Sequence, residues 1–461
     1  MTTISDIKKQ IKNSSARAVV ENAIKLAKNN DEYHAILNLT EERALARAND
    51  VDAGKIIGKL AGVPFVVKDN FLAFGAPTTA ASKMLEKFNA PLQATAVEKL
   101  EAEGAICIGK ANLDAFAHGG STENSAFGPT KNAIDPTRVS GGSSGGSAVV
   151  TALSIVPFAL GTDTGGSIRQ PASFNGVVGV KPTYGTVSRY GVVAMASSTD
   201  TIGSLTSNVA DAEFVMDIIA GRDDRDMTTL PDFFKVQSDV KPGQKIGLIK
   251  EFMADGVDID VRNCINQYAD RLRAAGYTVE EVELPMIEYA LAIYYIIVPA
   301  EISSNLARFD GIRYGHRAEG VKTLAELYGK TRDEGFVTEN KRRIMIGSYV
   351  LSSGFFDAYY LQAQKARTLL INQFNELFSK YDALIGPVAP TTAFKLGDNT
   401  SDPIKMYLED IMTVPASLAG LPAISVPAGS DKSGLPIGVQ LIGPRQSDAA
   451  LLSLARSLEI K

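Results

Sequence analysis

Short apolar runs alternate with helical patterns along the first half of the chain. Residues 63–67 and 105–108 have the length of buried strands, and residues 148–160 read as a buried helix followed by a strand. Apolar residues recur at helical spacing in residues 18–27, and residues 95–103 also have a helical pattern. This alternation predicts an α/β fold in which helices flank a buried, largely parallel or mixed central β-sheet.

The second half of the chain adds a long helical stretch. Residues 286–380 are mostly helical in pattern, and strand-like runs return at 383–385, 423–426 and 438–442. Because no linker separates two halves, we expect one domain over residues 1–461. Its parts are N-terminal helices at about 1–50, a core at about 60–220, a helical insertion at about 286–380, and C-terminal strands with a helix at about 381–461. Residues 223–243 read as a surface loop.

Composition narrows the class of protein. With a net charge of −5, the chain lacks the excess of basic residues expected of a protein that binds nucleic acid without a partner. Two Cys form no disulfide framework, which fits the cytoplasm. The first residues lack the pattern of a signal peptide. The apolar runs at 148–160 and 290–300 are too short to span a bilayer, so no membrane association is expected.

Two Gly/Ser loops stand out as candidate chemistry. They are Ser140–Ser147 and Gly161–Pro171, and apolar residues lie between them. A flexible linker would be polar throughout. Successive N–H groups in glycine-rich loops can instead form a concavity that holds a negative oxygen. The two loops therefore indicate a catalytic centre.

Several other kinds of site fit less well. Residues 104–111 nearly match a phosphate-binding loop, but Ala111 stands where Ser or Thr should hold a metal, and the residues between the glycines are apolar. Ser143 could be a nucleophile-elbow serine, yet the only histidine after it is His316, in a polar segment. His34, His118 and His316 have no metal-ligand spacing, so no metal is expected, and His34 and His316 read as surface residues.

A serine nucleophile with a lysine base remains. The serine hydroxyl needs a base, and lysine can serve only when its surroundings lower its pKa. Lys68 follows an apolar strand, and sites form at strand ends in α/β sheets. A lone lysine in that place is usually a solvated surface group, so the assignment rests on its combination with the Gly/Ser loops.

These features together resemble the amidase signature family over nearly the whole chain. The resemblance rests on the two Gly/Ser loops and Val67-Lys68-Asp69. It implies a Ser-cisSer-Lys catalytic set whose serines lie 24 residues apart, as here (167 − 143 = 24). Ser167 would then be the nucleophile, Ser143 the proton relay and Lys68 the general base. The same resemblance implies an oxyanion hole formed by the N–H groups of Thr164, Gly165, Gly166 and Ser167.

Further segments resemble one branch of the family, the A subunits of aspartyl/glutamyl-tRNA amidotransferases. They include residues 80–83, 121–132, 181–191, 303–311, 341–345 and 351–354. The resemblance implies hydrolysis of glutamine to glutamate and ammonia. It also implies that the B and C subunits are partners, with tRNA bound mainly through the former. The partner subunit would use ATP and Mg to amidate Glu-tRNA(Gln), and Asp-tRNA(Asn) would be a further substrate. This chain itself would need no cofactor.

Glutamine recognition requires charges of both signs. An Arg suits the α-carboxylate and a carboxylate suits the α-ammonium. By resemblance these are Arg343, or Arg342 beside it, and Asp410 after Tyr407, with the Tyr294-Tyr295 pair lining the pocket. Taken alone, the two arginines could be surface charges on a helix and Asp410 a solvated helix residue.

The chain also departs from the branch. Ala115 stands where Glu is usual and His118 where Met is usual, and both would flank the glutamine pocket and the ammonia exit. Other departures are Ser140, Asn175 and Leu72-Ala73. Two other functions stay open, a free-standing amidase for small carboxamides and a scaffold without catalysis. The intact Lys68, Ser143 and Ser167 count against the scaffold.

Overall fold

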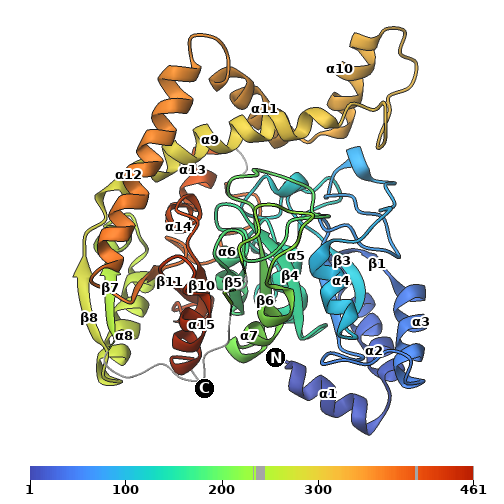
Figure 1. Cartoon of the computed structure of the whole chain (residues 1–461), viewed down its shortest axis with the longest axis horizontal. Helices are drawn as coiled ribbons and strands as arrows, with labels where there is room; N and C mark the ends of the chain where they lie inside the picture. Colours follow the sequence, from blue (N-terminus) through green and yellow to red (C-terminus); the bar gives the residue numbers. More distant parts are fainter. Residues whose placement is uncertain (232, 235–243, 400–402, 460–461) are drawn as a thin grey trace.

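The chain folds around one mixed β-sheet, shown in Figure 1. The structure is a computed structural model and describes residues 1–231, 233–234, 244–399 and 403–459. Within these residues the sheet has 11 strands in the order β1-β3-β2-β4-β6-β5-β10-β11-β9-β7-β8. The strands are β1 (Ile36–Leu39), β2 (Pro64–Lys68), β3 (Ile106–Ala111), β4 (Phe158–Asp163), β5 (Val178–Lys181), β6 (Thr201–Thr206), β7 (Lys245–Ile249), β8 (Thr278–Val282), β9 (Ala383–Pro387), β10 (Ala423–Ser430) and β11 (Pro436–Ile442).

The sheet is mixed, as the sequence predicts. β2 pairs in parallel with both β3 and β4, and β7 pairs in parallel with β8 and β9. The strands between these two groups, from β4 through β6, β5, β10 and β11 to β9, pair antiparallel. The long antiparallel centre was not foreseen, because the pattern of single strands does not reveal which neighbours they take.

Both faces of the sheet are buried along its inner strands, such as β2, β3, β4 and β6. Successive side chains of a strand point to opposite faces. In β2, Phe65 and Val67 therefore join one apolar cluster and Val66 joins another, which contains Val149 and Val150 of α5 (Gly145–Ala152). Continuing the alternation places Lys68 on the face of Val66, which α5 covers.

Helices cover these faces and extend beyond the sheet. α7 contacts both α4 and α15, and α5 contacts α6. The helices outside the insertion are α1 (Ile4–Asn13), α2 (Ala16–Asn29), α3 (Glu41–Asp52), α4 (Thr95–Ala102), α5, α6 (Arg169–Asn175), α7 (Val209–Ile219), α8 (Ile259–Ala274), α13 (Pro403–Leu408), α14 (Val414–Leu418) and α15 (Asp448–Ser457). Side-chain caps define the N-termini of several helices. Thr3 and Asp6 form a capping box at α1, and the Asn208 side chain accepts a hydrogen bond from Asp211 N at α7.

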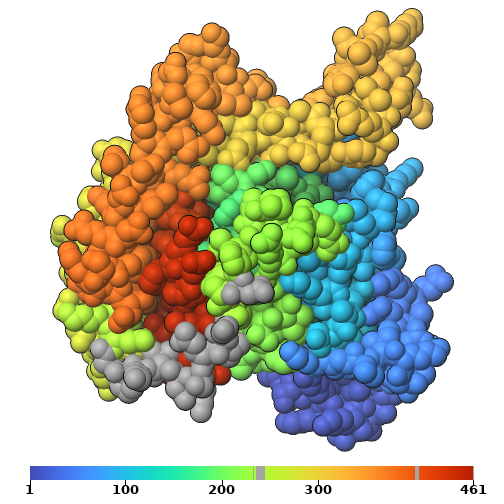
Figure 2. Space-filling view, in the orientation of Figure 1, coloured from blue at the N-terminus to red at the C-terminus, as the bar shows by residue number. Residues whose placement is uncertain are grey.

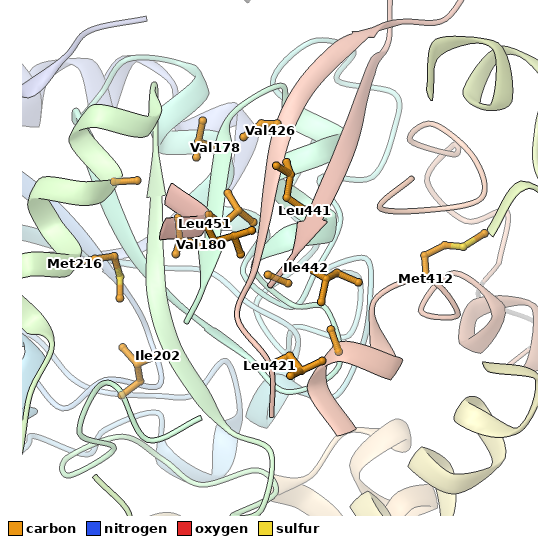
Figure 3. Packing of buried hydrophobic residues seen from close by; sticks show 14 of the residues in the cluster. Val178, Val180, Ile202, Met216, Met412, Leu421, Val426, Leu441, Ile442 and Leu451 are labelled. Atoms are coloured by element: carbon orange, nitrogen blue, oxygen red, sulfur yellow. The ribbon is translucent and has the colours of Figure 1, made fainter. Parts of the chain in front are cut away.

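The central part of the hydrophobic core fills the space between β5, β10, β11 and the neighbouring helices. Figure 3 shows Val178 and Val180 of β5 close to Leu441 and Ile442 of β11, with Leu451 of α15 between them. All five side chains are at most 3% exposed. Close packing of this kind holds the strand ends, and therefore the loops that follow them, in fixed positions.

Residues 286–380 are mostly helical, as their apolar pattern predicts. The insertion comprises α9 (Ala290–Asn305), α10 (Leu324–Gly335), α11 (Thr338–Val350) and α12 (Leu361–Phe378), with a π-helical turn at Phe356–Tyr360. Figures 1 and 2 show it lying along one edge of the body and rising from it in two arms, one formed by α10 and one by the junction of α11 and α12.

One apolar helix of the insertion is longer than the run at 290–300 suggested. Among the described residues, Pro285–Arg308 is the one segment long and apolar enough to cross a membrane, and 50% of its most apolar window is buried inside the protein. α9 within it packs against α11 and α12. Contacts of this kind are those of a core helix.

The N-terminal region contains a strand in addition to the predicted helices. Residues 4–50 were predicted to form helices alone, yet they also contain β1, which pairs antiparallel with β3. β1 is only four residues long and half-buried, so it has little of the pattern that marks a strand. Of the predicted surface loop at 223–243, residues 232 and 235–243 lie outside the described residues.

Candidate active site

Lys68 ends β2 and its amine is fully buried. Lys68 Nζ lies 2.7 Å from Ser143 Oγ, 2.9 Å from Thr162 Oγ1 and 3.3 Å from the Thr162 carbonyl oxygen. Burial lowers the pKa of Lys68 from 10.5 to about 7, although Asp114, Asp163 and Asp200 favour the charged form. Near neutral pH a large share of Lys68 is therefore an uncharged amine, which can accept a proton.

Thr162 controls where that amine points. A neutral amine has two N–H donors and one lone pair. The two Thr162 oxygens can accept both hydrogens, which leaves the lone pair facing Ser143 Oγ. Asn70 Nδ2 donates to Thr162 Oγ1 at 3.1 Å and so holds this hydroxyl in place.

Ser143 lies just before α5, after a cis peptide bond between Gly142 and Ser143. The buried Gln170 fixes this loop: its Oε1 accepts from Gly142 N at 2.9 Å, and its Nε2 donates to the Gly120 carbonyl at 2.8 Å. There is no room for side chains here, because a Cβ on Gly142 would overlap Asp114. The loop thus presents the Ser143 hydroxyl to Lys68.

Ser167 lies in the second Gly/Ser loop, between β4 and α6. Its carbonyl accepts from Ser144 N at 3.0 Å, which joins the two loops. A buried bidentate ion pair between Asp163 and Arg169 stabilises the loop. Arg169 Nε donates to Asp163 Oδ2 and Arg169 Nη2 donates to Asp163 Oδ1, both at 2.9 Å. Gly166 has a φ of +150°, where side chains are strained, and a Cβ there would overlap Thr413.

The predicted oxyanion-hole residues form a buried turn. Thr164 Oγ1 donates to Asp200 at 2.8 Å, which anchors one end of the turn. Within the described residues, the N–H groups of Gly165, Gly166 and Ser167 have no protein acceptor, although all three residues are buried. Unpaired buried N–H groups are rare, and a cluster of them can stabilise a negative oxygen.

Arg343 is buried in α11 and not exposed on the surface of the helix. Arg343 Nε donates to Glu339 Oε1 at 2.8 Å, and the guanidinium lies 5.2 and 5.5 Å from the ring centroids of Tyr295 and Tyr407. No hydrogen bond joins its Nη atoms to another described residue. Arg343 lines a small cavity, and a guanidinium can bind a carboxylate through two hydrogen bonds. Arg342 also contacts Glu339, but its side chain is 39% exposed.

Asp410 provides a buried carboxylate on the same side of the site. Tyr295 Oη donates to Asp410 Oδ2 at 3.2 Å, and Tyr295 stacks on Tyr407 with centroids 3.9 Å apart. Burial raises the pKa of Asp410 to about 7, and Arg343 partly offsets this. A cationic group near Asp410 would favour its ionised form. A cavity of about 90 Å³ lies beside Arg343 and Tyr407 and is also lined by Gly119, whereas Asp410 is not among its lining residues.

The recognition residues and the catalytic loop meet directly. Thr413 lies three residues after Asp410, and its hydroxyl donates to the Gly165 carbonyl at 2.6 Å. Tyr294 covers the same loop so closely that a Cβ on Gly165 would lie 2.7 Å from Tyr294 Oη. The structure therefore brings all the predicted residues into one region: Lys68, Ser143, Thr164, Gly165, Gly166, Ser167, Tyr294, Arg343 and Asp410.

Among the described residues, no histidine forms a hydrogen bond with Lys68 or Ser143. His34 is exposed, and His316 Nε2 pairs with Glu334 at 2.6 Å, so neither contacts Ser143. His118 is buried, and its Nδ1 lies 2.7 Å from Asn340 Nδ2, so it accepts that hydrogen bond. Burial and then Arg343 lower the pKa of His118 well below its usual value. Among the described residues, no group of His, Cys, Asp and Glu could hold a metal ion.

Several residues of the site were missed in the sequence. Thr162, Asp163, Arg169 and Gln170 all lie within the second Gly/Ser loop, so their nearness to Ser167 along the chain was visible. Their roles depend on contacts between segments that no local pattern reveals. Glu339 comes four residues before Arg343, a spacing that brings two side chains together on a helix.

The fold and this site define the class of protein. A buried lysine amine is hydrogen-bonded to one serine, and a second serine lies in a loop whose backbone N–H groups have no protein acceptor among the described residues. This is the arrangement of a serine hydrolase that uses no histidine. A family model described as amidase matches residues 18–452. The chain belongs to the amidase family.

Individual relatives agree with this assignment. The chain is 51% identical over 470 residues to the A subunit of the glutamyl-tRNA(Gln) amidotransferase from Thermosynechococcus vestitus, covering 100% of this chain and 98% of that protein. Its fold is similar to the crystal structure of the A subunit of the same name from Thermotoga maritima, with a TM-score of 0.83, 40% identity, and 99% and 94% of the two chains covered. A bacterial aryl acylamidase gives a TM-score of 0.86 at 26% identity, with 99% and 95% covered.

Proposed function

We propose that this chain is the glutamine-hydrolysing subunit of a tRNA-dependent amidotransferase. The observation that carries the proposal is the buried Lys68 amine, 2.7 Å from Ser143 Oγ, next to the turn of Ser167. The names of the relatives that are about 50% identical over the full chain support the choice of substrate. The tRNA substrate is Glu-tRNA(Gln), and Asp-tRNA(Asn) is the second one to test.

The chemistry proceeds through a glutamyl ester of Ser167. Ser167 Oγ attacks the side-chain amide carbon of glutamine, and its proton passes through Ser143 to the neutral Lys68 amine. The N–H groups of Gly165, Gly166 and Ser167 stabilise the oxyanion, and each such donor lowers the barrier by about 3 kcal/mol. Lys68 returns the proton through Ser143 to the leaving ammonia, and water then hydrolyses the ester.

Recognition of glutamine uses the charges beside the catalytic loop. Arg343 binds the α-carboxylate with its free Nη atoms, and Asp410 binds the α-ammonium. Tyr294 covers the side chain of the substrate above Gly165. This pairing of charges distinguishes free glutamine from a simple amide, which would leave both buried groups unpaired.

The chain itself uses no cofactor, and the ammonia passes to a companion subunit that uses ATP and Mg. We propose the B and C subunits of the amidotransferase as companions in the cytoplasm, with tRNA held mainly by the former. The net charge of −5 supports this division, because phosphate binding needs a basic surface.

Assays of ammonia and glutamate release test the proposal. Glutamine should be hydrolysed in preference to carboxamides that lack the α-carboxylate and α-ammonium, and addition of the companion subunits with Glu-tRNA(Gln) and ATP should yield Gln-tRNA(Gln). Higher activity on small amides without dependence on companions would favour a free-standing amidase, a reading that the aryl acylamidase fold keeps open. A chain inactive under every condition would be a scaffold.

A further inference from the structure

The junction of α11 and α12 exposes an unusual number of large apolar side chains. We call residues 344–361 the insertion tip. Its exposed large residues are Met345, Tyr349, Leu351, Phe355, Phe356, Tyr359 and Leu361, which are between 36% and 72% exposed. Figure 2 shows that this arm stands out from the body of the molecule. Contiguous apolar surface of this kind is rare on a protein that works alone, and it marks an interaction site.

The exposed rings are already arranged as a cluster. Tyr349 lies 4.4 Å from Phe355 between ring centroids, and Tyr359 lies 6.2 and 6.0 Å from these two rings. Aromatic residues and Met are enriched at the centres of protein–protein interfaces, where they supply most of the binding free energy. A cluster ordered before binding also loses little conformational entropy when a partner covers it.

Charge decides which kind of partner fits. Residues 344–361 contain one charged side chain, Asp357, and no Lys or Arg. Nucleic acid is excluded as an occupant, because its phosphates require cations. A second copy also fits poorly: a two-fold interface would bury one Asp357 from each copy, and residues 344–361 contribute no cation to pair with either carboxylate. Within the described residues Asp357 forms no ion pair.

The tip is connected to the substrate site through α11. Arg343 faces the site, while Met345 and Tyr349 of the same helix face solvent. α11 touches α9 at Gly347, where an added Cβ would overlap the carbonyl oxygen of Pro299. α9 carries Tyr294 and Tyr295. A protein seated on the tip would therefore hold the two helices that position the recognition residues.

We propose that the insertion tip is the docking surface for a companion protein whose face is an apolar recess with a Lys or Arg at its edge. This inference rests on the proposed function, which requires a companion to receive ammonia. The relatives' designation as subunits supports a partner different from the chain itself.

Association measured by sedimentation velocity tests the proposal with the full chain and the B and C subunits from the same organism. The tip variant combines Phe355→Ser, Phe356→Ser and Tyr359→Ser. The control combines Ile57→Ser, Met227→Ser and Ile259→Ser, which are 52–79% exposed, more than the three tip residues, and lie elsewhere in the chain. We expect the tip variant to bind about 100-fold more weakly and the control to bind like the wild type. Asp357→Lys should weaken binding by about tenfold at low salt and less at high salt.

Binding of the tip variant at wild-type affinity would overturn the proposal. So would a wild-type homodimer that becomes monomeric only in the tip variant, because the occupant would then be a second copy. A wild-type chain that binds neither companion would overturn it as well. Glutamine hydrolysis by each chain alone is measured in parallel and should be the same in all variants, so a failure of docking is distinguished from a failure of the glutaminase.

Discussion

The catalytic side of the site, formed by Lys68, Ser143 and Ser167, is built differently from its recognition side, formed by Arg343 and Asp410. Lys68, Ser143 and Ser167 lie in short loops and strand ends within one part of the sheet, joined by direct hydrogen bonds between loops. Arg343 of α11 and Asp410, just after α13, come from helical segments instead, and the rings of Tyr295 and Tyr407 pack between these segments. The comparison indicates that recognition can change while the chemistry stays intact.

Removal of the nucleophile should have the largest effect. For Ser167→Ala we expect kcat on glutamine to fall by at least about 10⁴-fold, because no other group can form the ester. Binding of glutamine, followed by calorimetry, should persist because the recognition side is untouched.

Ser147→Ala is the matched control for this prediction. Ser147 lies in the first Gly/Ser loop, its hydroxyl donates to the Leu160 carbonyl at 3.0 Å, and among the described residues no hydrogen bond joins it to Lys68. Its kcat should remain within a few-fold of the wild-type value. Full activity of Ser167→Ala would instead assign the nucleophile to another serine.

Arg343→Ala should separate recognition from chemistry. We expect KM for glutamine to rise by about 100-fold, because a charge-assisted contact to the carboxylate is lost. Hydrolysis of an amide that lacks the carboxylate should change little. Arg342→Ala serves as the control, since that side chain is 39% exposed, and should alter KM only slightly. Equal losses on both substrates in Arg343→Ala would refute the role in carboxylate binding.

The two sides also differed in how far the sequence revealed them. The strand before Lys68, the two Gly/Ser loops and the helical insertion were all visible in local patterns, because burial and turn chemistry act over a few residues. β1 was missed because four half-buried residues carry little pattern. The stacking of Tyr295 on Tyr407 and the support of Arg343 by Glu339 could not be derived, because they depend on how distant helices pack.

The pH dependence should differ between substrates. Lys68 must be neutral and Asp410 ionised, and both have a pKa of about 7. Below pH 7, kcat/KM on a simple amide should fall about tenfold per pH unit, because only Lys68 must lose a proton. On glutamine it should fall more steeply, approaching about 100-fold per unit, because both groups must lose one.

Asp410→Asn tests this assignment. The variant should bind glutamine more weakly, and the slope of its profile should return to one proton. Burial and then Arg343 lower the pKa of His118 well below its usual value, so His118 is neutral near pH 7. Identical slopes for glutamine and the simple amide in the wild-type chain would show that Asp410 does not bind the ammonium.

The smallest effect is expected where a residue acts only through another. Glu339 Oε1 accepts from Arg343 Nε at 2.8 Å and from Tyr407 Oη at 3.0 Å, so it orients the guanidinium without reaching the catalytic loop. Glu339→Gln keeps an acceptor but removes the charge, and KM for glutamine should rise by about three- to tenfold at unchanged kcat. Tyr407→Phe removes one hydrogen bond to Glu339 and should raise KM by about twofold. A fall in kcat at saturating glutamine in Glu339→Gln would place Glu339 in the chemistry, and the division between the two sides would then be wrong.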